Sequence, residues 1–178
     1  LDRLYLELND VQYRLGKPTI AAVKGAARAG GMTVALSCNM VIAGEGATFG
    51  YPEINVGLIP ALHYVHLPRI VGRHRAFEYL FTGDDFGADV ALDLGIINHV
   101  VPDDQVMGKA MEIAEKLAAK SPVVMKLGRD AYMRAVDTAY RRDVENVAET
   151  MRNVVATDDC REGLAAFMEK RPPKWQGS

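Results

Sequence analysis

The segment 17–57 constrains the fold of this chain most strongly. It reads KPTIAAVKGAARAGGMTVALSCNMVIAGEGATFGYPEINVG. An apolar, β-rich run at Thr19–Val23 is followed by a turn of small residues, and Gly30 and Gly31 then open a short apolar helix. A strand that leads through a glycine turn into a helix exposes backbone N–H groups at the positive end of the helix dipole. Such donors can hold a developing oxyanion.

A single carboxylate follows the next strands of the same segment. Glu53 lies between Pro52 and Ile54, so its side chain is expected to be half-buried. A half-buried carboxyl group beside oxyanion donors can move a proton. The segment therefore predicts chemistry next to a polarised carbonyl group.

Composition excludes several other classes of protein. The 178 residues suit one domain, and with 49% hydrophobic and 25% charged residues they can bury an ordinary core. The net charge of −2 argues against a nucleic-acid partner, because such proteins usually present a basic face. No apolar run approaches the roughly 18 residues that a membrane span needs, so no membrane partner is expected.

The two cysteines, Cys38 and Cys160, lie in helical patterns and neither belongs to a C-x-x-C motif. This usage favours a reducing, cytoplasmic compartment, and the mitochondrial matrix remains an alternative. Leu1 is not an initiator Met, and the chain opens inside a helical pattern, so we expect it to be a piece of a longer protein.

The pattern divides the chain into a mixed α/β part, 1–101, and a helical part, 102–178, that resembles a cover or assembly layer. Residues 51–60 are expected to form a loop, and Asp84 and Asp85 a turn. Ser121 and Thr157 are expected helix N-caps. Helices are predicted at 2–15, 30–38, 61–71, 73–82, 87–94, 103–119, 122–136, 138–156 and 158–170, and strands at 19–23, 40–43, 47–50 and 96–101.

Four motifs, in order along the chain, resemble the crotonase superfamily, the enoyl-CoA hydratase/isomerase family. KPTIAAVKGAARAGG resembles its K-P-x-I-A-A-V-x-G-x-x-x-G-G segment, and TFGYPEINVGLIP resembles its F-x-x-P-E-x-x-x-G-x-x-P signature. YLFTGDDFGADVALDLGIINHVVP and the C-terminal TDDCREGLAAFMEKRPPKW resemble two further family blocks. The motifs are specific for the family and far less specific for the reaction, because one fold hosts several chemistries.

The resemblance implies an α/β crotonase-like (ClpP/crotonase) ββα spiral followed by a C-terminal helical region that serves trimerisation and the CoA site. It identifies this chain as the C-terminal two-thirds of such a protein. Family members carry a further segment ahead of the position that matches Leu1. That segment supplies strands of the spiral and the first of two oxyanion donors.

By the same resemblance, Gly30 supplies the second oxyanion donor, flanked by Ala29 and Gly31 in the substrate site. The alternative for the glycine pair is close packing of a helix on a strand. Thr33 departs from the family pattern, because hydratases of this family carry a second glutamate there. A threonine can hydrogen-bond water but cannot act as a base, although it can also be an ordinary helix residue.

The family's F-x-x-P-E signature implies that Glu53 is the catalytic acid/base, with Pro52 and Gly57 beside the substrate. The alternative is a surface glutamate after a proline.

Residues 61–67, ALHYVHL, also depart from the family's glycine-rich run. His63 and Tyr64 bring bulky side chains close to the pocket, where either can serve as an auxiliary donor, or they belong to a helix surface. His63 and His66 have i,i+3 spacing, but no third ligand is visible, so no metal site is expected.

At the C-terminal end, the resemblance implies that Phe167 and Lys170 bind CoA, sometimes that of a neighbouring subunit. The alternative is a solvated basic helix end, 167–171, that complements the helix dipole. The resemblance also implies a homo-oligomer, a trimer or a dimer of trimers. Methionines at helical spacing after Pro102 suit a core or an interface.

The resemblance implies an enzyme that acts on an acyl-CoA thioester through a stabilised enolate. Its single acid/base, Glu53, favours double-bond isomerisation. CoA arrives as part of the substrate, and no other cofactor is implied. Hydration, decarboxylation, C–C bond hydrolysis and a non-catalytic homologue that binds RNA or a protein remain alternatives.

Overall fold

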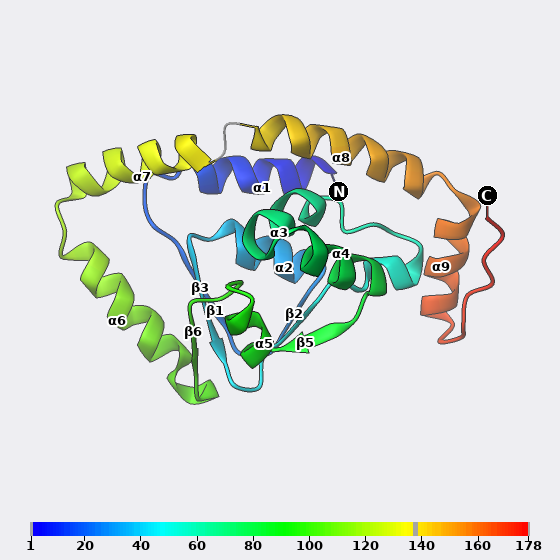
Figure 1. Ribbon diagram of the computed structural model, residues 1–178, viewed down its shortest axis with the longest axis horizontal. Coiled ribbons are helices and arrows are strands. Elements are labelled where there is room, and N and C mark those ends of the chain that lie inside the picture. The colour runs from blue at the N-terminus through cyan, green and yellow to red at the C-terminus, as the bar shows by residue number, and fades with distance from the viewer. Residues whose placement is uncertain (1, 137–138, 178) are drawn as a thin grey trace.

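The computed structural model describes residues 2–136 and 139–177, without the side chains of residues 2–6, 9, 140, 141 and 145. Its α/β part lies at the centre, and the later helices α6, α7, α8 and α9 run around its outside (Figure 1). None of the described helices is long and apolar enough to cross a membrane.

Two small sheets form the centre of the molecule. The first has the order β1-β3-β6, from Ile20–Val23, Met40–Gly44 and His99–Val101, and its pairs are parallel. The second has the order β2-β4-β5, from Ala26–Arg28, Thr48–Gly50 and Asp85–Gly87, and its last pair is antiparallel. β1 and β2 follow one another in the chain but belong to different sheets, and so do β3 and β4. A helix follows each of these two pairs. This arrangement is the expected ββα spiral.

Two strands were not predicted. The turn of small residues contains β2, and Asp85 begins β5 instead of belonging to a turn. Alanine, glycine and aspartate have low strand propensity, so these segments become strands through their partners. β2 and β5 both pair with β4, and Arg28 donates a hydrogen bond to Asp85 at 2.7 Å across this sheet.

The helices of the α/β part mostly lie where the pattern predicts them. α1 is Asp2–Arg14, α2 Gly30–Ser37, α3 His63–Val71, α4 Arg73–Thr82 and α5 Ala88–Asp93. Cys38 follows the end of α2 in an extended conformation, so only Cys160 is helical, and both cysteines are free. The expected loop at 51–60 contains the 3-10 helix η1, Pro52–Val56, because Pro52 presets the first helical φ angle.

The helical part contains the 3-10 turn η2, Asp103–Gln105, and then α6 (Val106–Ala118), α7 (Pro122–Val136), α8 (Tyr140–Val155) and α9 (Asp158–Met168). The predicted start of α8 at residue 138 lies outside the described residues. Both predicted caps are present. The Val124 N–H donates to Ser121 Oγ at 3.4 Å, and the Cys160 N–H donates to Thr157 Oγ1 at 3.1 Å.

The main core lies between the two sheets and the helices α2 to α5, and it includes Met32, Phe49, Tyr51 and Leu67. A smaller cluster forms where Val106 and Ala110 of α6 pack on Ile42 of β3. The first helix after Pro102 is thus integral with the sheet, and the division at residue 101 stays a prediction.

The later helices leave much apolar surface exposed. On α7, Val123, Val124 and Leu127 are 65%, 69% and 63% exposed. On α9, Phe167 and Met168 are 67% and 80% exposed. Exposed apolar stripes of this kind usually mark an interaction surface.

Candidate active site

The turn before α2 presents backbone donors. Ala29 has φ 49° and ψ −115°, an unusual conformation for a residue other than glycine. Its N–H donates to the Gly50 carbonyl at 3.2 Å, and its carbonyl accepts the Thr33 N–H at 3.1 Å. Among the described residues, the N–H groups of Gly30 and Gly31 have no backbone acceptor. These N–H groups at a helix N-terminus can hold an anionic oxygen.

Gly31 is exposed, and close packing does not explain why this position is a glycine. A Cβ added there would meet only the Cβ of Ala27, at an ordinary contact distance of 3.9 Å. The protein itself therefore leaves room for a side chain at this position. The bare backbone instead allows another molecule to approach the start of α2 closely.

Glu53 is on η1, directly after β4. Its side chain is half-buried, and its Oε2 atom is buried without a hydrogen-bond partner among the described residues. Burial raises the pKa of this carboxyl group, and its own backbone N–H opposes the shift. A carboxyl group with a raised pKa can both accept and donate a proton near neutral pH.

The phenol groups of Tyr51 and Tyr64 lie close enough to Glu53 to be affected by its charge. Burial, and then the charge of Glu53, raise the pKa of both Tyr51 and Tyr64, so both remain neutral. Tyr51 is fully buried, and its hydroxyl has no partner among the described residues. Sequence reasoning missed Tyr51, although its place directly before Pro52 and Glu53 was the available signal.

Thr33 and His63 come together inside the core, from α2 and α3. Thr33 Oγ1 and His63 Nε2 are hydrogen-bonded at 3.1 Å, and the two residues are 4% and 1% exposed. Burial, and then the charge of His66, lower the pKa of His63 to about 3, while a hydrogen bond with the Ala29 backbone opposes the shift. His63 is therefore a neutral imidazole that faces Thr33.

The second histidine of α3 packs against the first. The rings of His63 and His66 are 5.9 Å apart, and burial lowers the pKa of His66 to about 4. Within residues 2–136 and 139–177, no three His, Cys, Asp or Glu side chains gather as metal ligands would.

Helix α9 holds η1, and with it Glu53, in place. Gly57 ends η1 with φ 72°, and a Cβ there would lie 2.7 Å from the Asp159 carbonyl oxygen. A Cβ on Gly163 would overlap the Val56 carbonyl. The position of Gly57 is thus required by backbone conformation and packing, and its contact with a substrate stays a prediction.

The expected helix 158–170 ends earlier, at Met168, because Lys170 has φ 54° and leaves the helical path. Lys170 and Arg171 therefore follow α9. Arg171 donates to both carboxylate oxygens of Glu162, at 2.6 and 3.0 Å, while Phe167 and Lys170 are exposed. Arg171 thus pairs with Glu162 within the protein. This corrects the alternative in which Arg171 belongs to a solvated helix end.

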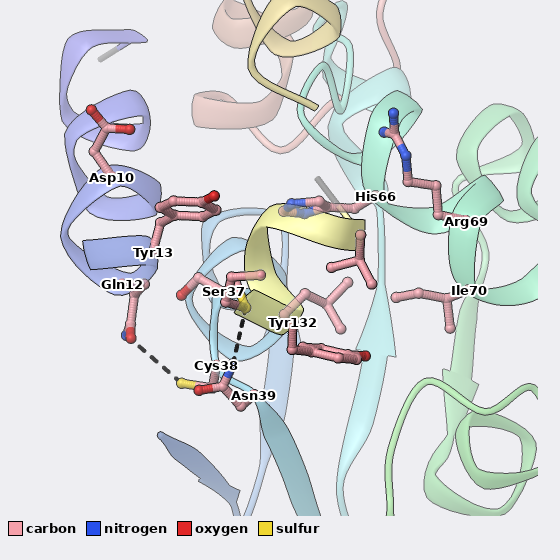
Figure 2. Close-up of a pocket in the computed structure, with 13 residues that line it drawn as sticks. Asp10, Gln12, Tyr13, Ser37, Cys38, Asn39, His66, Arg69, Ile70 and Tyr132 are labelled. Atoms are coloured by element: carbon pink, nitrogen blue, oxygen red, sulfur yellow. Dashed lines mark hydrogen bonds between the residues drawn. The ribbon is translucent and has the colours of Figure 1, made fainter. Parts of the chain in front are cut away.

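A cavity of about 660 Å³, which neither Glu53 nor the turn before α2 lines, lies between α1, the end of α2, α3 and α7. Figure 2 shows Tyr13 of α1 facing His66 and Arg69 of α3 across it, with Cys38 and Asn39 below. No residue predicted for the site lines it. Tyr64 lines a different hollow, of about 510 Å³, between α3 and α8.

The comparisons with known proteins agree with this fold. The "Probable enoyl-CoA hydratase, mitochondrial" of Dictyostelium discoideum is 34% identical over 163 residues, covering 91% of this chain and 59% of that protein. The chain therefore spans about three-fifths of the length of that relative.

Solved structures confirm the expected crotonase-type α/β fold. An enoyl-CoA hydratase from Mycobacterium avium subsp. paratuberculosis K-10 has a TM-score of 0.88 at 25% identity, covering 98% of this chain and 73% of that one. Methylmalonyl-CoA decarboxylase has a TM-score of 0.85 at 27% identity, covering 100% of this chain and 73% of that one.

The family model described as "Enoyl-CoA hydratase/isomerase" matches residues 2–178. The match extends from α1 to the segment beyond α9, and it includes the glycine turn and Glu53. The chain therefore belongs to the enoyl-CoA hydratase/isomerase family.

Proposed function

We propose that the protein acts on an acyl-CoA thioester and shifts a carbon–carbon double bond by way of an enolate. The environment of Glu53 is the single observation on which this proposal rests. One oxygen of its carboxyl group is buried without a hydrogen-bond partner among the described residues, and the pKa of this group is raised. Glu53 also follows β4, and the Gly50 carbonyl of that strand accepts the Ala29 N–H in the turn before α2. A single carboxylate is sufficient to remove and return one proton.

The proposed reaction begins with a 3-enoyl thioester whose carbonyl oxygen accepts the Gly30 N–H. By the family resemblance, we expect a second donor from a segment ahead of Leu1. Glu53 removes a proton from Cα, and the electrons of that C–H bond form the enolate. The double bond then moves from β,γ to α,β as Glu53 returns the proton to Cγ. The N–H donors stabilise the negative charge where it develops, on the oxygen.

Thr33 supports isomerisation over hydration. Its hydroxyl is bonded to His63 within the core, so position 33 offers no carboxylate to activate a water. Hydration is the second candidate, because the Dictyostelium discoideum relative is called a probable enoyl-CoA hydratase.

The test compares turnover of 3-enoyl-CoA, crotonyl-CoA and a malonyl-type thioester by the intact protein. We expect isomerisation to be the fastest reaction. Glu53→Gln should bind CoA and keep the fold, but reduce turnover by about 10²–10⁴-fold. Turnover by the Gln variant close to that of the unaltered protein would exclude Glu53 as the acid/base.

The panel also separates the alternatives. Hydration of crotonyl-CoA that exceeds isomerisation would refute the preference for isomerisation while keeping the enolate site. Decarboxylation of the malonyl-type thioester as the fastest reaction would reassign the chemistry at the same oxyanion donors.

A further inference from the structure

A buried polar contact lies directly beneath the turn that presents the Gly30 N–H. Thr33, on the first turn of α2, meets His63, the first residue of α3, through the 3.1 Å bond between Oγ1 and Nε2. Their exposed fractions of 4% and 1% leave almost no surface of either side chain open to solvent or substrate in this conformation. Any effect of His63 on a reaction must therefore act through its neighbours.

The turn above this contact is strained. Ala29 has φ 49° although it is not glycine. Such a conformation persists only when the surrounding structure holds it, and strained residues of this kind gather at functional sites. Two backbone bonds hold Ala29, from its own N–H to Gly50 and from the Thr33 N–H to its carbonyl. The second bond depends on the placement of Thr33.

His63 is well suited to fix Thr33. Its ring packs against that of Tyr51, with centroids 4.6 Å apart, and Tyr51 directly precedes η1. Burial lowers the pKa of His63 to about 3, so the imidazole stays neutral and its bond to Thr33 does not change with pH near neutrality. A continuous chain of contacts thus runs from η1 through Tyr51 and His63 to the start of α2.

We propose that His63 is a positioning residue for the oxyanion donor: through Thr33 it fixes the strained Ala29 turn and the direction of the Gly30 N–H. The inference rests on the proposed function, because it requires a thioester carbonyl at Gly30. It assigns His63 a role that needs neither a proton transfer nor contact with the substrate. It also explains why position 33 carries a hydroxyl that is buried and bonded.

The test uses two disrupting variants, Thr33→Val and His63→Leu, and two conservative ones, Thr33→Ser and His63→Gln, in the intact protein. The readout of donor alignment is the carbonyl stretching frequency of a bound enoyl-CoA thioester, measured by infrared difference spectroscopy. Hydrogen bonds from the oxyanion donors lower this frequency, whether or not turnover occurs. Steady-state kcat and KM, and denaturant unfolding, complete the set.

We expect both disrupting variants to lose most of the carbonyl shift and to reduce kcat about 10-fold or more, since removal of a whole oxyanion donor costs about 10²–10³-fold. KM should stay within about 2-fold, because in the proposed complex this turn contacts only the thioester carbonyl. The conservative variants should retain the shift and kcat. The double variant T33V/H63L should be no worse than His63→Leu, because His63→Leu already removes the bond that Thr33→Val breaks.

The outcomes separate the two proposals. A carbonyl shift that persists unchanged in Thr33→Val and His63→Leu would overturn the positioning role and leave the proposed function standing. Absence of any shift in the unaltered protein would overturn both. If His63→Leu does not fold, Thr33→Val alone decides, because it removes the hydroxyl with little change of shape. Glu53→Gln serves as the matched control: it should lose turnover and keep the full carbonyl shift.

Discussion

Gly163 of α9 lies directly against the backbone of Val56, the last residue of η1. A Cβ on Gly163 would overlap the Val56 carbonyl, and one on Gly57 would lie 3.0 Å from the Cα of Cys160. The bare backbone of two glycines therefore lets α9 approach the turn that carries Glu53. The C-terminal segment EGLAAF, 162–167, thus contributes to the placement of Glu53, more than 100 residues earlier in the chain.

Gly163→Ala should destabilise the protein. The added methyl group must displace backbone rather than a flexible side chain, and overpacking of this kind costs about 1–3 kcal/mol. Turnover should also fall, because η1 shifts with Glu53. Gly108→Ala is the matched control, since α6 has open space at Gly108 and alanine favours the helix by about 0.5–1 kcal/mol. Denaturant unfolding checks both, and a Gly163→Ala variant as stable as Gly108→Ala would contradict the packing.

Glu53→Gln should make the protein more stable at neutral pH. Because burial raises the pKa of Glu53 in the folded state, its ionisation disfavours folding. The stability that the protonated group provides is complete below the ordinary pKa of a glutamate. It is lost as the pH rises through the raised value. The difference in unfolding free energy between the variant and the unaltered protein should thus be small in acid and grow towards neutral pH. A difference that does not change with pH would show that the pKa is not raised.

Gly31→Ala should leave the fold intact and reduce turnover at least about 10-fold, because a side chain at the start of α2 keeps the thioester from the oxyanion donors. The nearest atom to the new Cβ is 3.9 Å away, so no loss of stability is expected. Gly128→Ala on α7, where nothing lies within 4 Å, is the control and should retain full activity. An active Gly31→Ala variant would place the substrate elsewhere.

The intact protein should self-associate through the exposed apolar face of α7. Val124 and Leu127 are 69% and 63% exposed and lie three residues apart on this helix. Val124→Glu and Leu127→Glu should shift the assembly towards monomers, because a charge cannot be buried there without a partner. Lys120→Glu, just ahead of α7, is the control. Light scattering measures the outcome, and a protein that is already monomeric at micromolar concentration would contradict it.

The candidate site was only partly predictable. Glu53 and the glycine turn stand out because a strand, a turn and a helix start follow one another within a short segment. Nothing in that local pattern indicates that Thr33 bonds to His63, which is 30 residues further along the chain. The sequence predicts that Thr33 stands where hydratases of the family carry a second glutamate, and that His63 can serve as an auxiliary donor. The structure instead joins the two in one buried contact.

By itself, the sequence determined the family, most of the helices and the position of Glu53, the one carboxylate expected in the site. These depend on local signals, such as the Thr157 cap of α9 and the apolar run at β1. Tertiary structure alone decided that 26–28 and 85–87 are strands, and that α9 supports η1. Strand pairing and backbone packing depend on partners distant in the sequence, whereas propensity and periodicity act over only a few neighbouring residues.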